Sequence, residues 1–149
     1  MIWFEAPRDR LRAWRDYRDS LTNLSLFEQA ERTADWWQWI PLGVRRLDQW
    51  KPETWPTPWE LVYQADFDEN SAALGMAYTL WLTNQDQQDS IDLVLINDTT
   101  NRKIKLVVEL DKFFWLNYNI GQVVDKRKLE DVEVLVNHAY RDLHGLKKL

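Results

Sequence analysis

Acidic side chains are the residues of this sequence that are best suited, by type and spacing, to chemistry. Asp66, Asp68, Glu69 and Asn70 stand close together just before an apolar segment. Their Asp-x-Asp-x-Asn spacing is similar to the start of a calcium-binding loop, but such a loop needs a glycine at its sixth position, and this one has none. Carboxylates at the start of a helix are stabilised by the helix dipole. We therefore interpret the cluster as the capped beginning of a helix.

A wider set of carboxylates raises an alternative, a metal-dependent hydrolase. It would use Asp66, Asp68, Asp92 and Glu109, with Lys105 beside them, since two-metal sites combine several acidic residues. Alternation along the expected strands, however, places charged residues on the exposed face of a sheet. Convergence of the four carboxylates in space would support this hypothesis, and their dispersal would oppose it.

The sequence has no cysteine and only two histidines. Disulfides, thiolate metal sites and a cysteine nucleophile are therefore excluded. His138 and His144 are too few for an all-histidine metal site, and both stand in a charged tail where we expect surface residues. We predict neither a bound metal ion nor a cofactor.

Charge and hydropathy argue against two classes of partner. The net charge is −5 and the isoelectric point is about 5.0, whereas non-specific nucleic-acid binding needs a basic surface. The first residues lack the basic and apolar regions of a signal peptide, and no apolar run approaches the length of a membrane span. We predict no nucleic-acid or membrane partner, and a soluble protein inside a cell or in an assembly built there.

Tryptophan is the compositional outlier, with 10 residues in the chain. A domain of this size cannot easily bury so many indoles, and large aromatic residues are enriched at protein–protein contacts. The alternative is an aromatic core whose indole N–H groups are satisfied at its edge, and for the cluster at residues 36–39 both interpretations stay open. The candidates for a protein interface are Trp36, Trp37, Trp39, Trp50, Trp55 and Trp59.

The first part of the chain has the pattern of helices. Apolar residues at helical spacing predict a helix over Pro7 to Leu21. Ser25, with Glu28 three residues later, predicts the start of a second helix that ends near Pro41. The segment that follows is irregular, with a turn of helix open for residues 44–50.

Two further helices are expected before the pattern changes. Thr57 as N-cap and Glu60 three residues later form a capping box for a short helix over Pro58 to Tyr63. A longer helix over Asp68 to Leu82 is apolar on more than one side, which is typical of a buried helix. Gly75 within it costs about 1 kcal/mol relative to alanine, and a close contact with neighbouring backbone would explain its presence.

Strand patterns begin after Asn84. Apolar and β-branched runs bounded by turn residues predict a series of strands, although a helix that begins at Lys128 is an alternative for the last one. Helices first and strands afterwards indicate an α+β fold: a helical N-terminal half followed by an antiparallel sheet of about four or five strands, packed on a central buried helix. The expected strands are residues 91–96, 104–110, 113–116, 122–125 and 132–136.

One motif carries a resemblance to a known family. The segment Trp55-Pro56-Thr57-Pro58-Trp59-Glu60, followed by Asp66-Phe67-Asp68-Glu69-Asn70-Ser71-Ala72-Ala73-Leu74, resembles the approach to the active-site helix of bacterial transglutaminase-like cysteine peptidases, members of the papain-like superfamily. In that family a cysteine opens the central helix, a histidine stands at the start of a later strand, and an Asp or Asn lies near the end of the next strand. The similarity covers roughly residues 55–117.

The resemblance implies three catalytic positions, and this chain fills them with other residues. The cysteine position falls at or next to Asp68, the histidine position at Ile104 or Lys105, and the orienting position at Asn117. A carboxylate is a far weaker nucleophile than a thiolate, and neither isoleucine nor lysine reproduces a neutral imidazole base. The resemblance therefore implies a pseudoenzyme without catalytic residues, in which Asp68, Lys105 and Asn117 mark a degenerate site.

The same signature, with the Ala-Leu-Gly-Met helix, also resembles small proteins of tailed bacteriophages of cyanobacteria. We predict a single domain over residues 1–149, with a Trp-rich helical lead (1–54), a transglutaminase-like core (55–120) and a C-terminal strand and tail (121–149). The expected function is that of a non-enzymatic structural or interaction protein in the neck, tail or baseplate of a phage particle, located in the virion or the host cytoplasm. Its expected partners are copies of itself or other virion proteins. A free phage factor that binds a host protein is the alternative.

Overall fold

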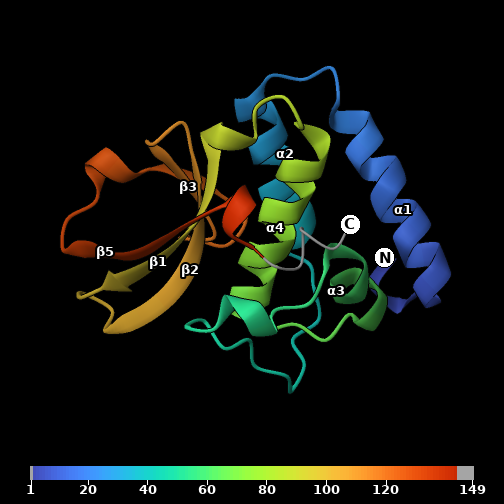
Figure 1. The fold of residues 1–149 in the computed structure, drawn as a ribbon, viewed down its shortest axis with the longest axis horizontal. Coiled ribbons are helices and arrows are strands. Elements are labelled where there is room, and N and C mark those ends of the chain that lie inside the picture. Colours follow the sequence, from blue (N-terminus) through green and yellow to red (C-terminus); the bar gives the residue numbers. More distant parts are fainter. Residues whose placement is uncertain (1, 144–149) are drawn as a thin grey trace.

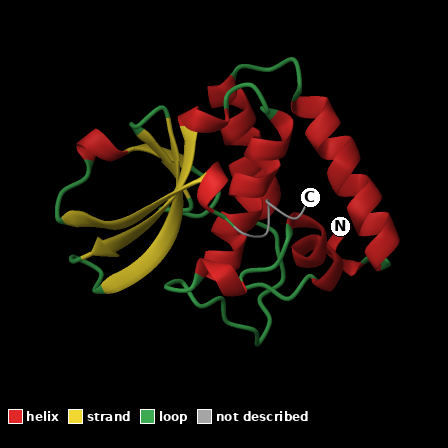
Figure 2. Cartoon of the chain, in the orientation of Figure 1, coloured by secondary structure: helices red, strands yellow, loops and turns green. Residues whose placement is uncertain are grey.

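Helices fill the first half of the chain and strands the second in the computed structural model, which describes residues 2–143 (Figures 1 and 2). The sheet forms one layer and the helices the other, with α4 between the sheet and α1 (Figure 1). The predicted α+β fold is confirmed. The α-helices are α1 (Pro7–Leu21), α2 (Leu26–Trp37), α3 (Pro58–Gln64) and α4 (Glu69–Thr83). The strands are β1 (Ile91–Asp98), β2 (Lys103–Leu110), β3 (Phe114–Leu116), β4 (Val123–Asp125) and β5 (Val132–Ala139).

The sheet is antiparallel, with the strand order β4-β3-β2-β1-β5. The long hairpin of β1 and β2 is its centre, and Ile91 lies opposite Leu110. The strand β5 pairs with the free edge of β1, with a register shift between Leu95 and Ile96. Its observed conformation excludes the alternative of a helix from Lys128, since residues 126–128 form only a single 3₁₀ turn.

Local capping explains where the helices begin. Pro7 occupies the first position of α1, where its missing N–H costs nothing. The Ser25 hydroxyl accepts a hydrogen bond from the N–H of Glu28 and starts α2. The predicted capping box of Thr57 and Glu60 is present at α3, with both reciprocal hydrogen bonds formed.

Helix α4 is buried between the sheet and the other helices, as its apolar sequence predicts. It contacts α1, α2 and α3 on one side and β1 and β2 on the other. The residue that lets α2 approach is Gly75, because a Cβ atom there would lie 2.2 Å from the ring of Trp37. The expected contact of Gly75 with neighbouring backbone is therefore corrected: an indole ring occupies the space.

The segment between α2 and α3 forms no α-helix at residues 44–50. The N–H of Arg45 donates to the Asp66 carboxylate at 3.2 Å, and the N–H of Leu47 donates to the Asp68 carboxylate at 2.9 Å. Leu42 forms a parallel bridge with Phe67. These backbone groups therefore bond to the chain just before α4, which holds the segment extended.

His144, for which we predicted a surface position, lies outside the described residues. Within residues 2–143, the helices are too short and too polar to cross a membrane.

Candidate functional site

Asp68, Lys105 and Asn117, three of the predicted site residues, all have contacts at the start of α4. Asp68 is the N-cap of this helix and is 8% exposed. One carboxylate oxygen accepts the N–H of Ser71 at 2.8 Å, and the other accepts the N–H of Leu47 at 2.9 Å. The Ser71 hydroxyl in turn accepts the N–H of Asp68 at 2.7 Å. Both oxygens of the carboxylate thus hold backbone in place, which is the work of a helix cap.

Lys105 is held in an ion pair beside this cap. Its ammonium group donates to Glu69 Oε1 at 3.1 Å and to the carbonyl of Tyr118 at 2.8 Å. Lys103 pairs with the second oxygen of Glu69. Burial acts to raise the pKa of the Glu69 carboxyl, but the hydrogen bonds and charges of Lys103 and Lys105 outweigh it and lower the pKa. This role of Glu69 is not predicted by any local pattern of the sequence.

Asn117 ties three elements together. Its backbone is left-handed, with φ of 71°, and its amide donates to the carbonyl of Glu69 at 3.0 Å and to that of Leu106 at 3.1 Å. The Asn70 side chain accepts the N–H of Leu106 at 3.0 Å from the other side. Asn117 therefore fastens the end of β3 to β2 and to the first turn of α4.

Lys105 and Asn117 both bond to Glu69, which follows Asp68 in the chain. Asp68, Lys105 and Asn117 are each bonded to their own structural partners, and in the described part of the chain no hydrogen bond joins any two of the three.

The polar network continues to the far face of the sheet. The ammonium group of Lys105 lies 5.5 Å from the centre of the Tyr118 ring. The Tyr118 hydroxyl and the Asn101 side-chain amide both donate to Asp98 Oδ2, at 3.2 and 2.7 Å, and the Asn101 backbone N–H donates to Oδ1 at 3.3 Å. Burial acts to raise the pKa of Asp98, but these hydrogen bonds and the charge of Lys105 lower it. No local pattern predicts that Lys105 and Tyr118 join Asp98 in this network, because Tyr118 stands far from the other two residues in the chain.

The four carboxylates of the hydrolase hypothesis fall in two separate places. Asp92 and Glu109 face each other across β1 and β2, while Asp66 and Asp68 bond to the backbone of residues 45 and 47. Burial raises the pKa of Asp92, and the charge of Glu109 adds to this effect. Within residues 2–143 no three carboxylates or imidazoles gather in a way that could hold a metal ion.

Glu109 also differs from the expectation of a solvent-facing side chain. It is 6% exposed, because its carboxylate accepts the indole N–H of Trp115 at 3.0 Å and pairs with Lys126 at 2.7 Å. These two partners compensate the loss of water around the charge. Glu109 therefore does not lie on a solvated surface. It bonds to Trp115, which belongs to the smaller hydrophobic cluster of Val94, Ile96, Val107 and Trp115.

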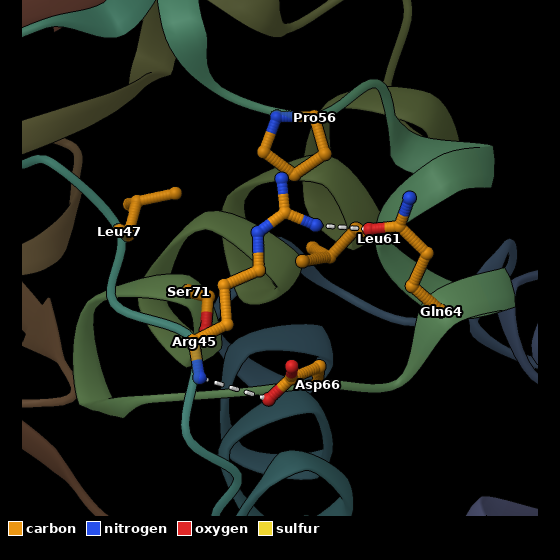
Figure 3. Close-up of a pocket in the computed structure, with 7 residues that line it drawn as sticks. All are labelled: Arg45, Leu47, Pro56, Leu61, Gln64, Asp66 and Ser71. Atoms are coloured by element: carbon orange, nitrogen blue, oxygen red, sulfur yellow. Dashed lines mark hydrogen bonds between the residues drawn. The ribbon is translucent and has the colours of Figure 1, made fainter.

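A small cavity beside α3 is closed by polar contacts. Figure 3 shows the Arg45 guanidinium directed to the Gln64 side chain, while the Arg45 backbone N–H bonds to Asp66. The cavity measures about 10 Å³, which is the space of a single water molecule at most. We therefore do not regard it as a ligand site.

A larger cleft of about 290 Å³ opens over Glu69 and Asn117. Ala72 and Met76 of α4 line it, and its rim carries two strongly exposed apolar residues, Leu42 at 77% and Ile120 at 74%. Of the three degenerate-site residues, Asn117 lines this cleft, whereas Asp68 and Lys105 do not. Its lining mixes apolar side chains with the ion pair of Glu69 and Lys103.

The tryptophans divide between core and surface. Trp39 is 60% exposed, Trp50 55% and Trp59 39%, and Trp36 is half-buried. Trp37 and Trp55, which we predicted as interface candidates, instead belong to the core. The Trp37 indole packs on Gly75 and donates to Thr79 at 3.0 Å, and the Trp55 indole donates to the carbonyl of Asp48 at 2.7 Å.

Comparison with known proteins gives a match in structure but not in sequence. No known protein family has a model that matches the chain, and no curated protein matches it in sequence. Three solved structures of LapG from Legionella pneumophila superpose on it. The first has a TM-score of 0.73 at 15% identity and covers 90% of this chain and 76% of LapG.

The other two structures are of LapG in different states. The calcium-bound form gives a TM-score of 0.74 at 14% identity, over 91% of this chain and 77% of that one. The EGTA-treated form gives 0.72 at 13% identity, over 95% and 87%. Identities this low show a shared fold and nothing about activity. This chain has the fold of LapG.

Proposed function

We propose that this protein is a non-enzymatic interaction protein that keeps a transglutaminase-like scaffold and serves as a component of a phage particle. The observation that carries the proposal is the substitution of the catalytic positions at the start of α4. Asp68 stands in the place of the nucleophile and Lys105 in that of the base. Both are bound into structural contacts.

The chemistry of these residues supports the loss of peptidase activity. A peptidase of this kind needs a thiolate and a neutral base within hydrogen-bond reach, and the chain contains no cysteine. The two oxygens of Asp68 are engaged with backbone N–H groups. Lys105 is held by Glu69, which also pairs with Lys103, and by the carbonyl of Tyr118.

Exposed aromatic and aliphatic side chains support an interaction role. Trp39, Leu42, Val44 and Ile120 are each at least 60% exposed. Large apolar groups at the surface are the anchors of protein–protein contacts, and clusters of them are uncommon on proteins that act alone. We infer that the partners are proteins: further copies of this chain or other proteins of the particle.

The first experiment asks where the protein goes during infection. An epitope-tagged copy is expressed in infected cells, and particles are purified on a density gradient. We expect the tag to sediment with the particles at a fixed ratio to the capsid protein. Recovery only from the soluble lysate, bound to a host protein, would contradict the particle role and favour a free host-binding factor.

The second experiment tests the absence of enzymatic activity. The purified protein is incubated with casein and with a peptide library, and cleavage is followed by mass spectrometry. We expect no products beyond those of a buffer control. Cleavage that is lost in both Asp68→Asn and Lys105→Met would mean that the site is catalytic after all.

A further inference from the structure

A hollow of about 200 Å³ lies between the start of the chain and the end of α2, and its lining combines indole rings with one carboxylate. Trp3, Trp36 and Trp39 supply the rings, Asp35 the carboxylate, and Ile2 completes the lining. The hollow shares no lining residue with the cleft over Glu69. It is therefore a separate feature from the degenerate site.

The core holds two of the three rings in place. Trp36 stacks on Tyr17 with 4.8 Å between ring centres and 19° between the planes. Trp3 meets Trp36 at 5.1 Å and a steep angle of 65°. Trp3 is 4% exposed, whereas Trp39 stands at the solvent rim with 60% exposed. A ligand would therefore find a largely preformed wall, which lowers the entropic cost of binding.

Asp35 brings a charge without a cationic partner in residues 2–143. The hydrogen bond that its carboxylate accepts comes from the neutral amide of Gln38 at 2.7 Å, and none of the ion pairs of the described chain includes it. Burial raises the pKa of Tyr17 to about 12, and the charge of Asp35 adds to this effect while Arg32 opposes it. The field of Asp35 therefore reaches the aromatic cluster.

A second hollow extends the negative charge along α2. It measures about 420 Å³ and is lined by Glu31, Asp35 and residues 121–123 at the start of β4. Asp35 lines both hollows. Glu31 and Asp35 are four residues apart on one face of α2, both are exposed, and neither has an ion-pair partner in the described chain. Two neighbouring like charges repel each other, and a bound cation relieves this repulsion.

Indole rings beside a carboxylate are the combination that recognises organic cations. We propose that the hollow binds the arginine side chain of a partner protein, with the guanidinium against Trp36 and Trp39 and in contact with Asp35. A second basic residue of the same segment pairs with Glu31. Arginine suits the site better than lysine, because its planar, weakly hydrated group stacks on aromatic rings. This inference rests on the proposed function in one respect: the cation belongs to another protein.

The test is an NMR titration of the full chain, labelled with nitrogen-15, with Nα-acetyl-arginine amide. The matched neutral probe is Nα-acetyl-citrulline amide, which has the same shape without the charge. We expect saturable shifts of the Trp36 and Trp39 indole signals with the arginine probe, weaker at high salt, and little shift with citrulline. Equal shifts with the two probes, or none with either, would overturn the proposal.

Paired variants locate the site. Trp39→Ala and Asp35→Asn should each weaken the arginine probe about two- to fivefold, as expected for one ring contact or one exposed ion pair. Trp50→Ala and Asp86→Asn change an exposed indole and an exposed carboxylate outside the lining, and they should leave the affinity unchanged. All four residues are exposed, so thermal unfolding should show intact folds. Unaltered affinity in both site variants would refute the assignment.

Further outcomes distinguish a partner protein from a small molecule as the source of the cation, and distinguish failure of this inference from failure of the proposed function. Tetramethylammonium that bound more than tenfold tighter than the arginine probe would identify a small quaternary ammonium ligand and overturn the partner assignment. If no cation binds but the protein still sediments with phage particles, this inference fails and the proposed function stands. If the arginine probe binds but the protein is absent from particles, the cation site stands and the particle role fails.

Discussion

One hydroxyl group satisfies the aromatic core at the scale of single residues. Thr79 Oγ1 accepts the indole N–H of Trp14 and that of Trp37, each at 3.0 Å, and donates to the carbonyl of Gly75 at 2.8 Å. A hydroxyl has two acceptor positions and one donor, so its full capacity is used. Trp14, Trp37 and Thr79 are fully buried, so water cannot replace the hydroxyl as acceptor for the two indole N–H groups.

Thr79→Val should therefore be unusually costly for a substitution of nearly the same shape. It leaves two buried indole N–H groups without acceptors, at about 1–3 kcal/mol each, so we expect the free energy of unfolding to fall by about 2–5 kcal/mol. Thr83→Val is the control, because the Thr83 hydroxyl makes one hydrogen bond, to the carbonyl of Thr79, and is half-buried. Urea unfolding gives both values, and a similar small loss in the two variants would contradict this account.

The two lysines that share Glu69 should also differ in their contribution to stability. The Lys105 side chain is 9% exposed and that of Lys103 is 50% exposed. Lys105→Met removes a buried charged donor from Glu69 and from the Tyr118 carbonyl, so we expect a loss of about 1–3 kcal/mol. Lys103→Met removes an exposed ion pair, for which we expect less than about 1 kcal/mol. Equal losses in chemical denaturation would show that burial does not set the strength of this network.

The packing of α2 on α4 depends on Gly75 at the scale of whole elements. Gly75→Ala would gain about 1 kcal/mol of helix propensity, but the new methyl group would meet the Trp37 ring. Overpacking of this kind costs about 1–3 kcal/mol, so we expect a net loss of stability. In the double variant with Trp37→Leu the methyl group should cost less than it does alone, and additive losses in the thermodynamic cycle would disprove the contact.

The contact of β5 with Trp55 should make stability depend on pH. The His138 ring packs on Trp55, with 5.3 Å between the ring centres. Burial lowers the pKa of His138 below the ordinary 6.5, while the charge of Asp142 acts in the opposite direction. The unfolded chain therefore binds a proton more readily, so stability should fall as the pH drops through about 6.5. His138→Gln should flatten the dependence between about pH 7.5 and 5.5 in urea titrations. An unchanged slope would assign it to other groups.

The elements that the sequence predicted well are those that local chemistry decides. Pro7 and the apolar spacing placed α1 at its observed bounds, and the Thr57 box placed the start of α3. Residues 44–50 lost the suggested turn of helix because Asp66 and Asp68, far along the chain, bind their N–H groups. The contact of Trp37 with Gly75 was hidden for the same reason, since the two residues meet only through the packing of α2 on α4.

At the scale of the whole molecule, the sequence indicated which residues to expect near the start of α4 but not which hydrogen bonds they would form. Lys105 and Asn117 both bond to Glu69, the neighbour of Asp68 in the chain, because the order of helix and strands brings β2 and the end of β3 to the start of α4. The hydrogen bonds of these residues, and the fact that Glu69 accepts several of them, depend on the directions of the side chains. No local sequence pattern predicts those directions. The division of the tryptophans into core and surface has the same origin, because a spacing does not say which layer covers a given face.

That division gives a prediction for the whole molecule, measured by acrylamide quenching of the tryptophan fluorescence. Trp39 and Trp50 are more than half exposed, whereas Trp55 is 6% exposed. We expect a readily quenched component that shrinks in the double variant Trp39→Leu with Trp50→Leu, with little change in stability, since exposed substitutions usually matter little.

Trp55→Leu is the matched change inside the core. It should leave the quenched component unchanged and lower the free energy of unfolding by about 2–4 kcal/mol, because it removes a packed ring and its hydrogen bond. The opposite result, with a quenched component that depends on Trp55, would place that ring on the surface. Binding of a partner through the α2 end should shield Trp39 and leave Trp50 accessible, so quenching of the two single variants in the presence of purified particle proteins would show which tryptophan the assembly covers.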